Sequence, residues 1–204
     1  MAVITISRQY GTNAKDFARE LSKALGYSYI DKDIYKRVAE RNNISIEEIK
    51  SIESITGLGI DIIQNLIDND FIKRIVGKNN ITFENEEIVK FIENSIKEFA
   101  SNDNIILLGR AAQCILQNDE NVFHIKLIKN FNDRVNFLIK KGITENGAKS
   151  TINRKDEERK NFIKKFYRQD WDNPELYHLI LNMSKISVDK GITLIKDLIT
   201  QSSV

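Results

Sequence analysis

The residues most able to do chemistry lie near the start of the chain, in Ser7-Arg8-Gln9-Tyr10-Gly11-Thr12-Asn13-Ala14-Lys15-Asp16. A β-branched run at residues 3–6 precedes this polar turn, and a helical apolar pattern follows it. A strand, a loop and a helix in this order can bind a phosphate, because loop N–H groups and the positive end of the helix dipole face the anion. Most of these contacts involve the main chain, so residues 11–14 need to be small or flexible more than they need particular side chains.

Charged side chains flank this loop. Arg8 and Lys15 supply cations for a phosphate. Asp16 places a carboxylate where a standard phosphate loop has its Mg²⁺-binding hydroxyl, so it either binds the metal, complements the helix dipole or repels phosphate. The loop does not fit the pattern G-x-x-x-x-G-K-[ST]. The sequence therefore predicts an anion site of unusual composition.

Two further polar residues follow predicted strands. Arg110 comes directly after Gly109, at the end of the apolar run 105–108, and a guanidinium there can bind a phosphate with two hydrogen bonds. Asp31 ends the run 27–30. Both face the crevice beyond the carboxyl ends of a parallel sheet, where such folds bind ligands. The alternatives are an ion pair for Arg110 and a helix cap for Asp31.

Residues 129–168 are strongly basic, with twelve Lys or Arg against five Asp or Glu. This excess suggests an anionic ligand. Arg154 and Arg159 lie in its most charged part, and Asp156 can pair with Arg159 at a spacing of three. A basic helical arm without glycine at this point is what a lid over phosphates requires, although the alternating charges also fit an ordinary exposed helix.

The elements that must position these residues alternate between strands and helices. Apolar runs predict strands at residues 3–6, 27–30, 105–108, 122–127 and 179–181, and helical patterns occur at 16–25, 32–42, 86–100, 130–140, 145–168 and 187–200. Alternation of this kind predicts an α/β fold, with a five-stranded parallel sheet covered by helices on both faces. The long helical block at about residues 32–100 is large enough to form a substrate-side subdomain.

Composition excludes several other classes of protein. The 204 residues are 41% hydrophobic and 29% charged, with no apolar run long enough to cross a bilayer and no signal-peptide pattern. The lone Cys114 excludes an internal disulfide, fits a cytoplasmic protein and is expected to be buried. His124 and His178 have no third ligand at metal-site spacing, so a zinc site is not expected. Trp171, in a polar turn, is interpreted as a structural anchor.

Several segments together resemble the cytidylate kinase-like family, in the same order as in that family. They are ITISRQYG at 4–11, LGYSYID at 25–31, LGRA at 108–111, NRKDEER at 153–159 and the stretch 171–182. The resemblance implies a P-loop NTPase-like three-layer fold with a helical insertion on the nucleoside monophosphate side and a helical lid. It implies one kinase-like domain over 1–204, with its core at about 1–31, 101–142 and 176–204, the insertion at about 32–100 and the lid at about 143–175.

The same resemblance implies phosphoryl transfer from ATP, with Mg²⁺, to a nucleoside monophosphate, with CMP or dCMP favoured. By position, the donor phosphate site comprises Arg8, Gly11, Thr12, Asn13, Ala14, Lys15 and Asp16. The acceptor site comprises Asp31, Gly109 and Arg110, and the catalytic residues are Lys15, Arg154 and Arg159. No residue is assigned as a metal ligand.

The sequence departs from cytidylate kinases in the loop itself. Arg8, Asn13 and Ala14 stand at the positions of the two outer glycines and the lysine, and Lys15 comes one place late. A nucleotide-binding regulatory protein that has lost catalysis is therefore an alternative. A third reading, an RNA-associated protein, is disfavoured because the aromatic residues of the basic segment follow helix-core spacing. We expect a cytoplasmic monomer or homodimer that binds no membrane.

Overall fold

The computed structural model describes residues 2–30, 93, 96–97, 99–101 and 103–201. The chain divides into two compact units, one of residues 1–29 with 102–204 and one of residues 30–101. Asp31 and the helix expected at 32–42 lie outside the described residues. Within the helix expected at 86–100, residues 93, 96, 97, 99 and 100 are helical.

A five-stranded sheet forms the centre of the first unit. Its strands are β1 (Val3–Arg8), β2 (Ser28–Ile30), β3 (Ile105–Leu108), β4 (Val122–Ile128) and β5 (Leu179–Asn182), in the spatial order β2-β3-β1-β4-β5. The central strand β1 pairs in parallel with β3 and β4, and β4 pairs in parallel with β5. This confirms the predicted α/β fold, because each of the five apolar runs forms a strand in one sheet.

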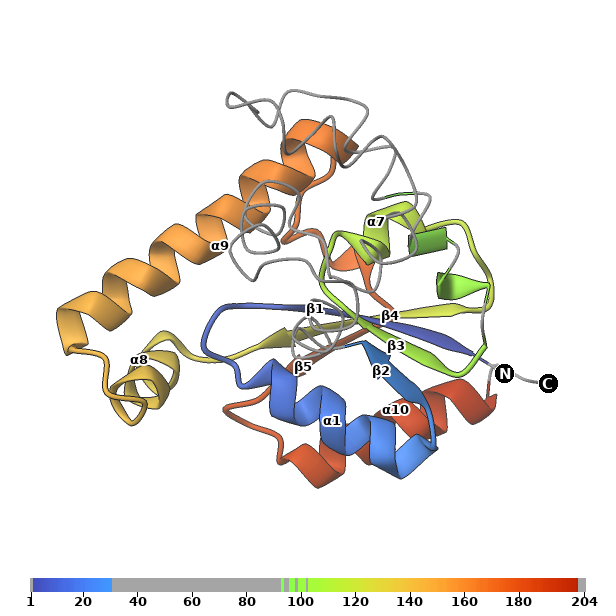
Figure 1. The fold of residues 1–204 in the computed structure, drawn as a ribbon, viewed down its shortest axis with the longest axis horizontal. Coiled ribbons are helices and arrows are strands. Elements are labelled where there is room, and N and C mark those ends of the chain that lie inside the picture. Colours follow the sequence, from blue (N-terminus) through green and yellow to red (C-terminus); the bar gives the residue numbers. More distant parts are fainter. Residues whose placement is uncertain (1, 31–92, 94–95, 98, 102, 202–204) are drawn as a thin grey trace, which may run out of the picture. The chain divides into compact units, whose positions relative to one another are not determined.

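One face of the sheet packs against two helices, α1 (Ala14–Leu25) and α10 (Val188–Gln201) (Figure 1). The buried side chains of α1 recur at helical spacing, at Ala14, Phe17, Ala18 and Leu21. They join Ile4, Ile6, Ile106, Ile125 and Leu127 from the strands in one hydrophobic core. Gly26, with φ +68°, ends α1 in the left-handed conformation that glycine adopts without strain.

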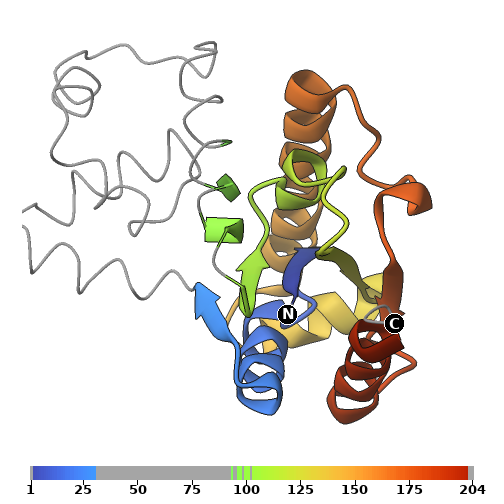
Figure 2. The same ribbon diagram turned by 90° about the vertical axis from the view of Figure 1, so that its right-hand side faces the viewer.

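The opposite face is covered by α7 (Ala112–Ile115), α9 (Glu145–Tyr167) and the 3₁₀ helix η1 (Pro174–Leu176), as the turned view in Figure 2 shows. Its apolar cluster contains Ala111, Cys114, Ile163, Trp171, Leu176 and Tyr177. The strands contribute buried polar side chains to this face, namely Thr5, Ser7, His124 and Lys126. The two faces therefore differ, with an aliphatic core on one side and a hydrogen-bonded one on the other.

Trp171 fixes the segment that follows α9 onto this polar face. It is 2% exposed, and its Nε1 donates to Ser7 Oγ over 2.7 Å. The buried Lys126 ammonium donates to the Trp171 carbonyl over 2.6 Å and to Asp172 Oδ1 over 2.9 Å, and Lys160 of α9 pairs with the other Asp172 oxygen at 2.7 Å. Burial lowers the pKa of Lys126, and Asp172 opposes that shift. The contacts give Trp171 the geometry of an anchor.

A short helix, α8 (Phe131–Ile139), precedes the long helix α9 and packs against its first turns. Thr144 caps α9 through a hydrogen bond from Gly147 N, and Arg168 ends it in a left-handed conformation. The helices predicted at 130–140, 145–168 and 187–200 are therefore present within two residues at each end. The sequence did not predict α7 and η1, which are four and three residues long.

Candidate functional site

The loop between β1 and α1 is a compact turn with two left-handed residues. Gly11 has φ +84° and Asn13 has φ +61°, and α1 begins at the following residue. The Thr12 hydroxyl donates to the Gln9 carbonyl over 2.9 Å, so this side chain holds the turn from within. Lys129 N donates to Gln9 Oε1 over 3.0 Å, which ties the loop to the end of β4. The arrangement places the N-terminus of α1 beyond the carboxyl edge of the sheet (Figure 1).

Helix α8 lies directly behind this loop. A Cβ added to Gly11 would lie 3.1 Å from Arg134 Cβ and 3.2 Å from the Arg134 carbonyl oxygen. Arg134 Nη1 donates to the Tyr10 carbonyl over 3.3 Å. Glycine is therefore needed at position 11 both for its positive φ and for the close approach of the α8 backbone.

A carboxylate from α9 reaches the same loop. Asp156 Oδ1 accepts hydrogen bonds from Tyr10 N at 2.7 Å and from Arg159 Nη1 at 3.0 Å, while its Oδ2 accepts from Arg134 Nη1 at 2.5 Å. The Arg159 guanidinium also lies 5.6 Å from the Tyr10 ring centroid. Burial lowers the pKa of Arg159, and the adjacent Asp156 opposes that shift. Two guanidinium groups and one carboxylate thus meet at the start of the loop.

The turn after β3 is strained. Gly109, Arg110 and Ala111 have φ values of +86°, +63° and +53°, so two residues other than glycine follow it in the left-handed region. Strain of this kind persists where surrounding structure enforces it, often at functional sites. A Cβ on Gly109 would lie 1.9 Å from Arg8 Nη1, which shows that the Arg8 guanidinium lies directly over this glycine. The predicted residues Arg8, Gly109 and Arg110 therefore belong to one neighbourhood.

The structure separates the two arginines predicted in the lid. Arg159 lies at the loop with 23% of its side chain exposed, whereas Arg154 is 57% exposed and pairs with Glu158 over 2.7 Å on the outside of α9. Lys15 and Asp16 occupy the first turn of α1, and the Asp16 carboxylate lies 3.7 Å from Arg19. Arg154 is thus not part of the group around the loop.

The sequence did not single out Arg134 or the main chain of Tyr10. A signal for Arg134 was present, since it falls on the apolar stripe of α8 together with Phe131, Val135 and Leu138. A charged residue on a stripe that faces the core needs a partner. The predicted pairing of Asp156 with Arg159 is confirmed, but its contact with Tyr10, 146 residues away, could not be inferred from spacing.

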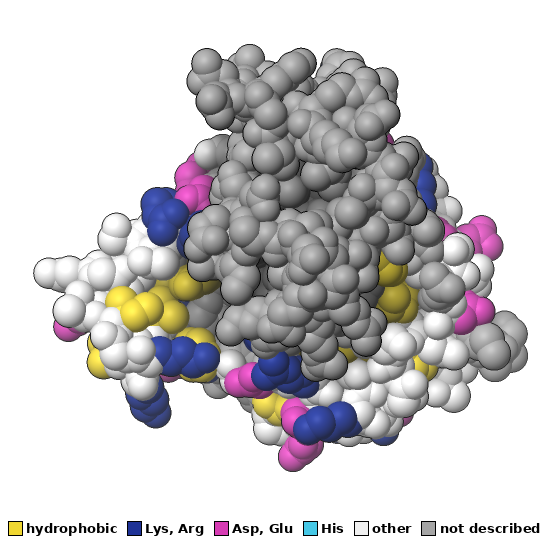
Figure 3. Space-filling model, viewed as in Figure 1, with side chains coloured by type: hydrophobic (Ala, Val, Ile, Leu, Met, Phe, Trp, Pro, Cys, Tyr) yellow, Lys and Arg dark blue, Asp and Glu magenta, His cyan; other side chains and the backbone are white. Residues whose placement is uncertain are grey.

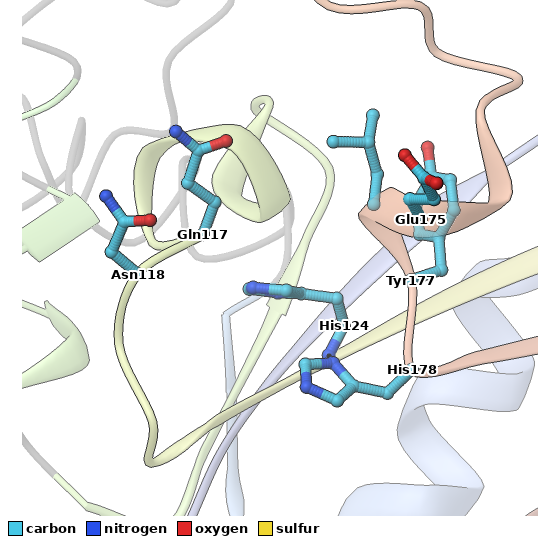
Figure 4. Close-up of a pocket in the computed structure, with 7 residues that line it drawn as sticks. Gln117, Asn118, His124, Glu175, Tyr177 and His178 are labelled. Atoms are coloured by element: carbon cyan, nitrogen blue, oxygen red, sulfur yellow. Dashed lines mark hydrogen bonds between the residues drawn. The ribbon is translucent and has the colours of Figure 1, made fainter.

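A separate pocket of about 260 Å³ lies toward the amino ends of β4 and β5, away from the loop (Figure 4). It is lined by Gln117, Asn118, His124, Glu175, Leu176, Tyr177 and His178. Burial, with a smaller effect of His178, lowers the pKa of His124 to about 4, so its ring is neutral at pH 7. His178 Nδ1 accepts the His124 N–H over 2.9 Å and is therefore unprotonated. A pocket with one carboxylate and two neutral imidazoles offers no cation to a phosphate.

Around α8 and α9, hydrophobic side chains lie beside Lys and Arg on the face in Figure 3. Among the residues that the structure describes, no group of three or more His, Cys, Asp or Glu side chains is placed to hold a metal ion. In the same described part of the chain, no helix is long and apolar enough to span a membrane.

The model of the cytidylate kinase-like family matches residues 3–185. The chain belongs to this family. Among solved structures, an uncharacterized protein from Eubacterium ventriosum ATCC 27560 superposes with a TM-score of 0.68 at 16% identity, covering 98% of each chain. Shikimate kinase from Bacteroides thetaiotaomicron superposes with a TM-score of 0.53 at 14% identity, again over 98% of each chain.

Shikimate kinase from Acinetobacter baumannii, in complex with shikimate, gives a TM-score of 0.53 at 10% identity, covering 100% of this chain and 96% of that one. None of the curated proteins compared with the sequence matches it. At these identities the solved structures bear on the fold alone, and they confirm the predicted P-loop NTPase-like three-layer fold. Membership of a cytidylate kinase-like family supports a kinase-like function toward a nucleotide or a small molecule.

Proposed function

We propose that this protein transfers a phosphoryl group from ATP to a nucleoside monophosphate, with CMP or dCMP as the favoured acceptor. The observation that carries the proposal is the convergence of Arg134 and Arg159 on Tyr10, at the start of a loop that opens into a helix N-terminus. Phosphoryl transfer needs positioning and neutralisation of charge more than covalent chemistry. Guanidinium groups beside the backbone N–H groups at the start of a helix supply both.

The positions of the described residues support the following proposed roles. Lys15 and the N–H groups of residues 11–16 hold the donor phosphates at the N-terminus of α1. Arg8, over Gly109, adds a cation beside them, and Arg110 holds the acceptor phosphate. Arg159 neutralises charge on the transferring group. Asp31 completes the acceptor side by its position in the family motif and lies outside the described residues.

The first turn of α1 offers one carboxylate that could hold Mg²⁺. Mg²⁺ is commonly held by one or two protein oxygens together with phosphate oxygens and water. The Asp16 carboxylate, on the first turn of α1 and 57% exposed, fits that need. When bound, the ion would neutralise charge on the donor phosphates.

The test is ADP release from Mg·ATP with a panel of nucleoside monophosphates. Turnover that depends on CMP or dCMP supports the proposal, and turnover with another acceptor corrects the substrate. Saturable ATP binding without ADP release from any acceptor would refute it. That outcome would favour a nucleotide-binding regulatory role, which Ala14 at the position of the usual loop lysine already suggests.

A further inference from the structure

Asp156 stands out because one carboxylate joins three separate parts of the unit. Its oxygens accept hydrogen bonds from the loop through Tyr10 N, from α8 through Arg134 and from α9 through Arg159. The Asp156 side chain is 14% exposed, and that of Arg134 is 9% exposed. Charge-assisted hydrogen bonds are short and directional, and partial burial strengthens them.

The two arginines would not share this place without an anion between them. Like charges in a site of low dielectric repel each other, and a buried guanidinium needs a partner. Arg134 cannot retreat easily, because its backbone lies against Gly11 and its Nη1 also donates to the Tyr10 carbonyl. The carboxylate therefore decides whether both guanidinium groups stay at the loop.

The Tyr10 contact adds a second effect. Tyr10 N is one of the N–H groups of the loop, and its hydrogen bond to Asp156 fixes the peptide group just before Gly11. The same carboxylate thereby orders the first turn of the loop and the two cations beside it. An arrangement prepared in this way needs less reorganisation during the reaction.

We infer that Asp156 is a positioning residue that holds Arg134 and Arg159 against the phosphate loop, ready for the transferring phosphoryl group. The part of the inference that names a phosphoryl group rests on the proposed function. The contact itself does not depend on that function. It assigns Arg134, beside Arg159, as a further cation of the site. Asp156 then acts through these two arginines.

The kinetic test uses Asp156→Asn, which keeps the shape of the side chain and removes its charge. The matched control is Glu157→Gln, which removes the same charge at the next, exposed position of α9. Misplaced groups can lower turnover on the order of 10²-fold, so we expect a loss of that size in kcat with KM for ATP nearly unchanged. A kcat equal to that of Glu157→Gln, or a loss accounted for entirely by unfolded protein in circular dichroism, would overturn the inference.

A second measurement works whether or not the protein is a kinase. Amide hydrogen exchange of the segment containing Tyr10 is followed in the wild type, Asp156→Ala and Glu157→Gln, without nucleotide. Asp156→Ala should speed exchange at Tyr10, because the acceptor of that N–H is removed, and should leave α10, on the other face of the sheet, unchanged. If the wild type turns over no acceptor, the proposed function fails, and hydrogen exchange alone then tests the positioning role of Asp156. Unchanged exchange at Tyr10 would then overturn the positioning role.

Discussion

Replacing Gly109 with alanine tests the link between the strained turn after β3 and the phosphate loop. One cost of the substitution is conformational, since φ at Gly109 is +86° and a Cβ in the left-handed region costs about 1–2 kcal/mol. The other is steric. The new Cβ would lie 1.9 Å from Arg8 Nη1 and 2.9 Å from its Cζ, so the guanidinium must leave its place.

Gly26→Ala is the matched control, because Gly26 has φ +68° and an added Cβ there meets no atom within 4 Å. Gly26→Ala should lose about 1–2 kcal/mol of unfolding free energy, and Gly109→Ala at least as much, measured by urea denaturation followed with circular dichroism. Only Gly109→Ala should weaken ATP binding. An arginine–phosphate hydrogen bond contributes about 1.5–3 kcal/mol, which corresponds to a roughly ten- to hundredfold higher Kd by calorimetry. Equal ATP affinity in the two variants would refute the placing of Arg8 in the donor site.

Three further predictions follow from the described contacts. Arg159→Ala should lower the rate of ADP release on the order of 10³-fold. Arg154→Ala should change that rate little, because Arg154 forms an exposed pair with Glu158. Equal losses in the two variants would contradict the separation of the two arginines. Trp171→Phe should lower the free energy of unfolding by about 2 kcal/mol, because Ser7 Oγ loses its buried donor. The urea titration must be followed by circular dichroism, because the substitution removes the one Trp of the chain and with it the Trp fluorescence. His124, with its pKa lowered from 6.5 to about 4, stays neutral in the folded protein, so the unfolded chain binds the extra proton as pH falls below about 6.5. Unfolding free energy should drop by about 2 kcal/mol between pH 7 and 5, and His124→Gln should abolish most of that drop.

The sequence predicted the sheet well because buried parallel strands carry an unambiguous signal. The run at 105–108 is apolar throughout, and strands covered on both faces need that pattern. In the run at 122–127, His124 and Lys126 alternate with apolar residues, which is also typical of a strand. By contrast, α7 and η1 are too short to show a period of 3.6 residues. Their places are set by tertiary packing around Trp171 and Cys114, which local patterns do not reveal.

The sequence predicted those parts of the candidate site whose residues are neighbours along the chain. It did not predict the contacts between segments that are far apart in sequence. The loop, its flanking cations and the pair Asp156–Arg159 all follow from residues close together in sequence. Arg134 and Tyr10 are brought to that pair from 22 and 146 residues away. No spacing rule covers such distances, so the contacts of Arg134 and Tyr10 with this pair appear only in the folded structure.

The unusual composition of the loop is offset elsewhere in the structure. Asn13 stands where the standard pattern has its second glycine, and it still adopts φ +61°, because asparagine tolerates the left-handed region better than most residues. Arg8 stands where the first glycine would be. The room that this side chain needs is provided by Gly109, across the pairing of β1 with β3.

Gly109, at the end of the neighbouring strand, thus leaves room for a guanidinium at the position of the first loop glycine. The backbone turn is thereby kept, and a cation is added within the same neighbourhood as Arg110. This arrangement supports positive charge at the proposed phosphate site, although Ala14 stands where the standard pattern has its lysine. It also makes Arg8 and Gly109 interdependent, so substitution of either one should affect nucleotide binding through the other.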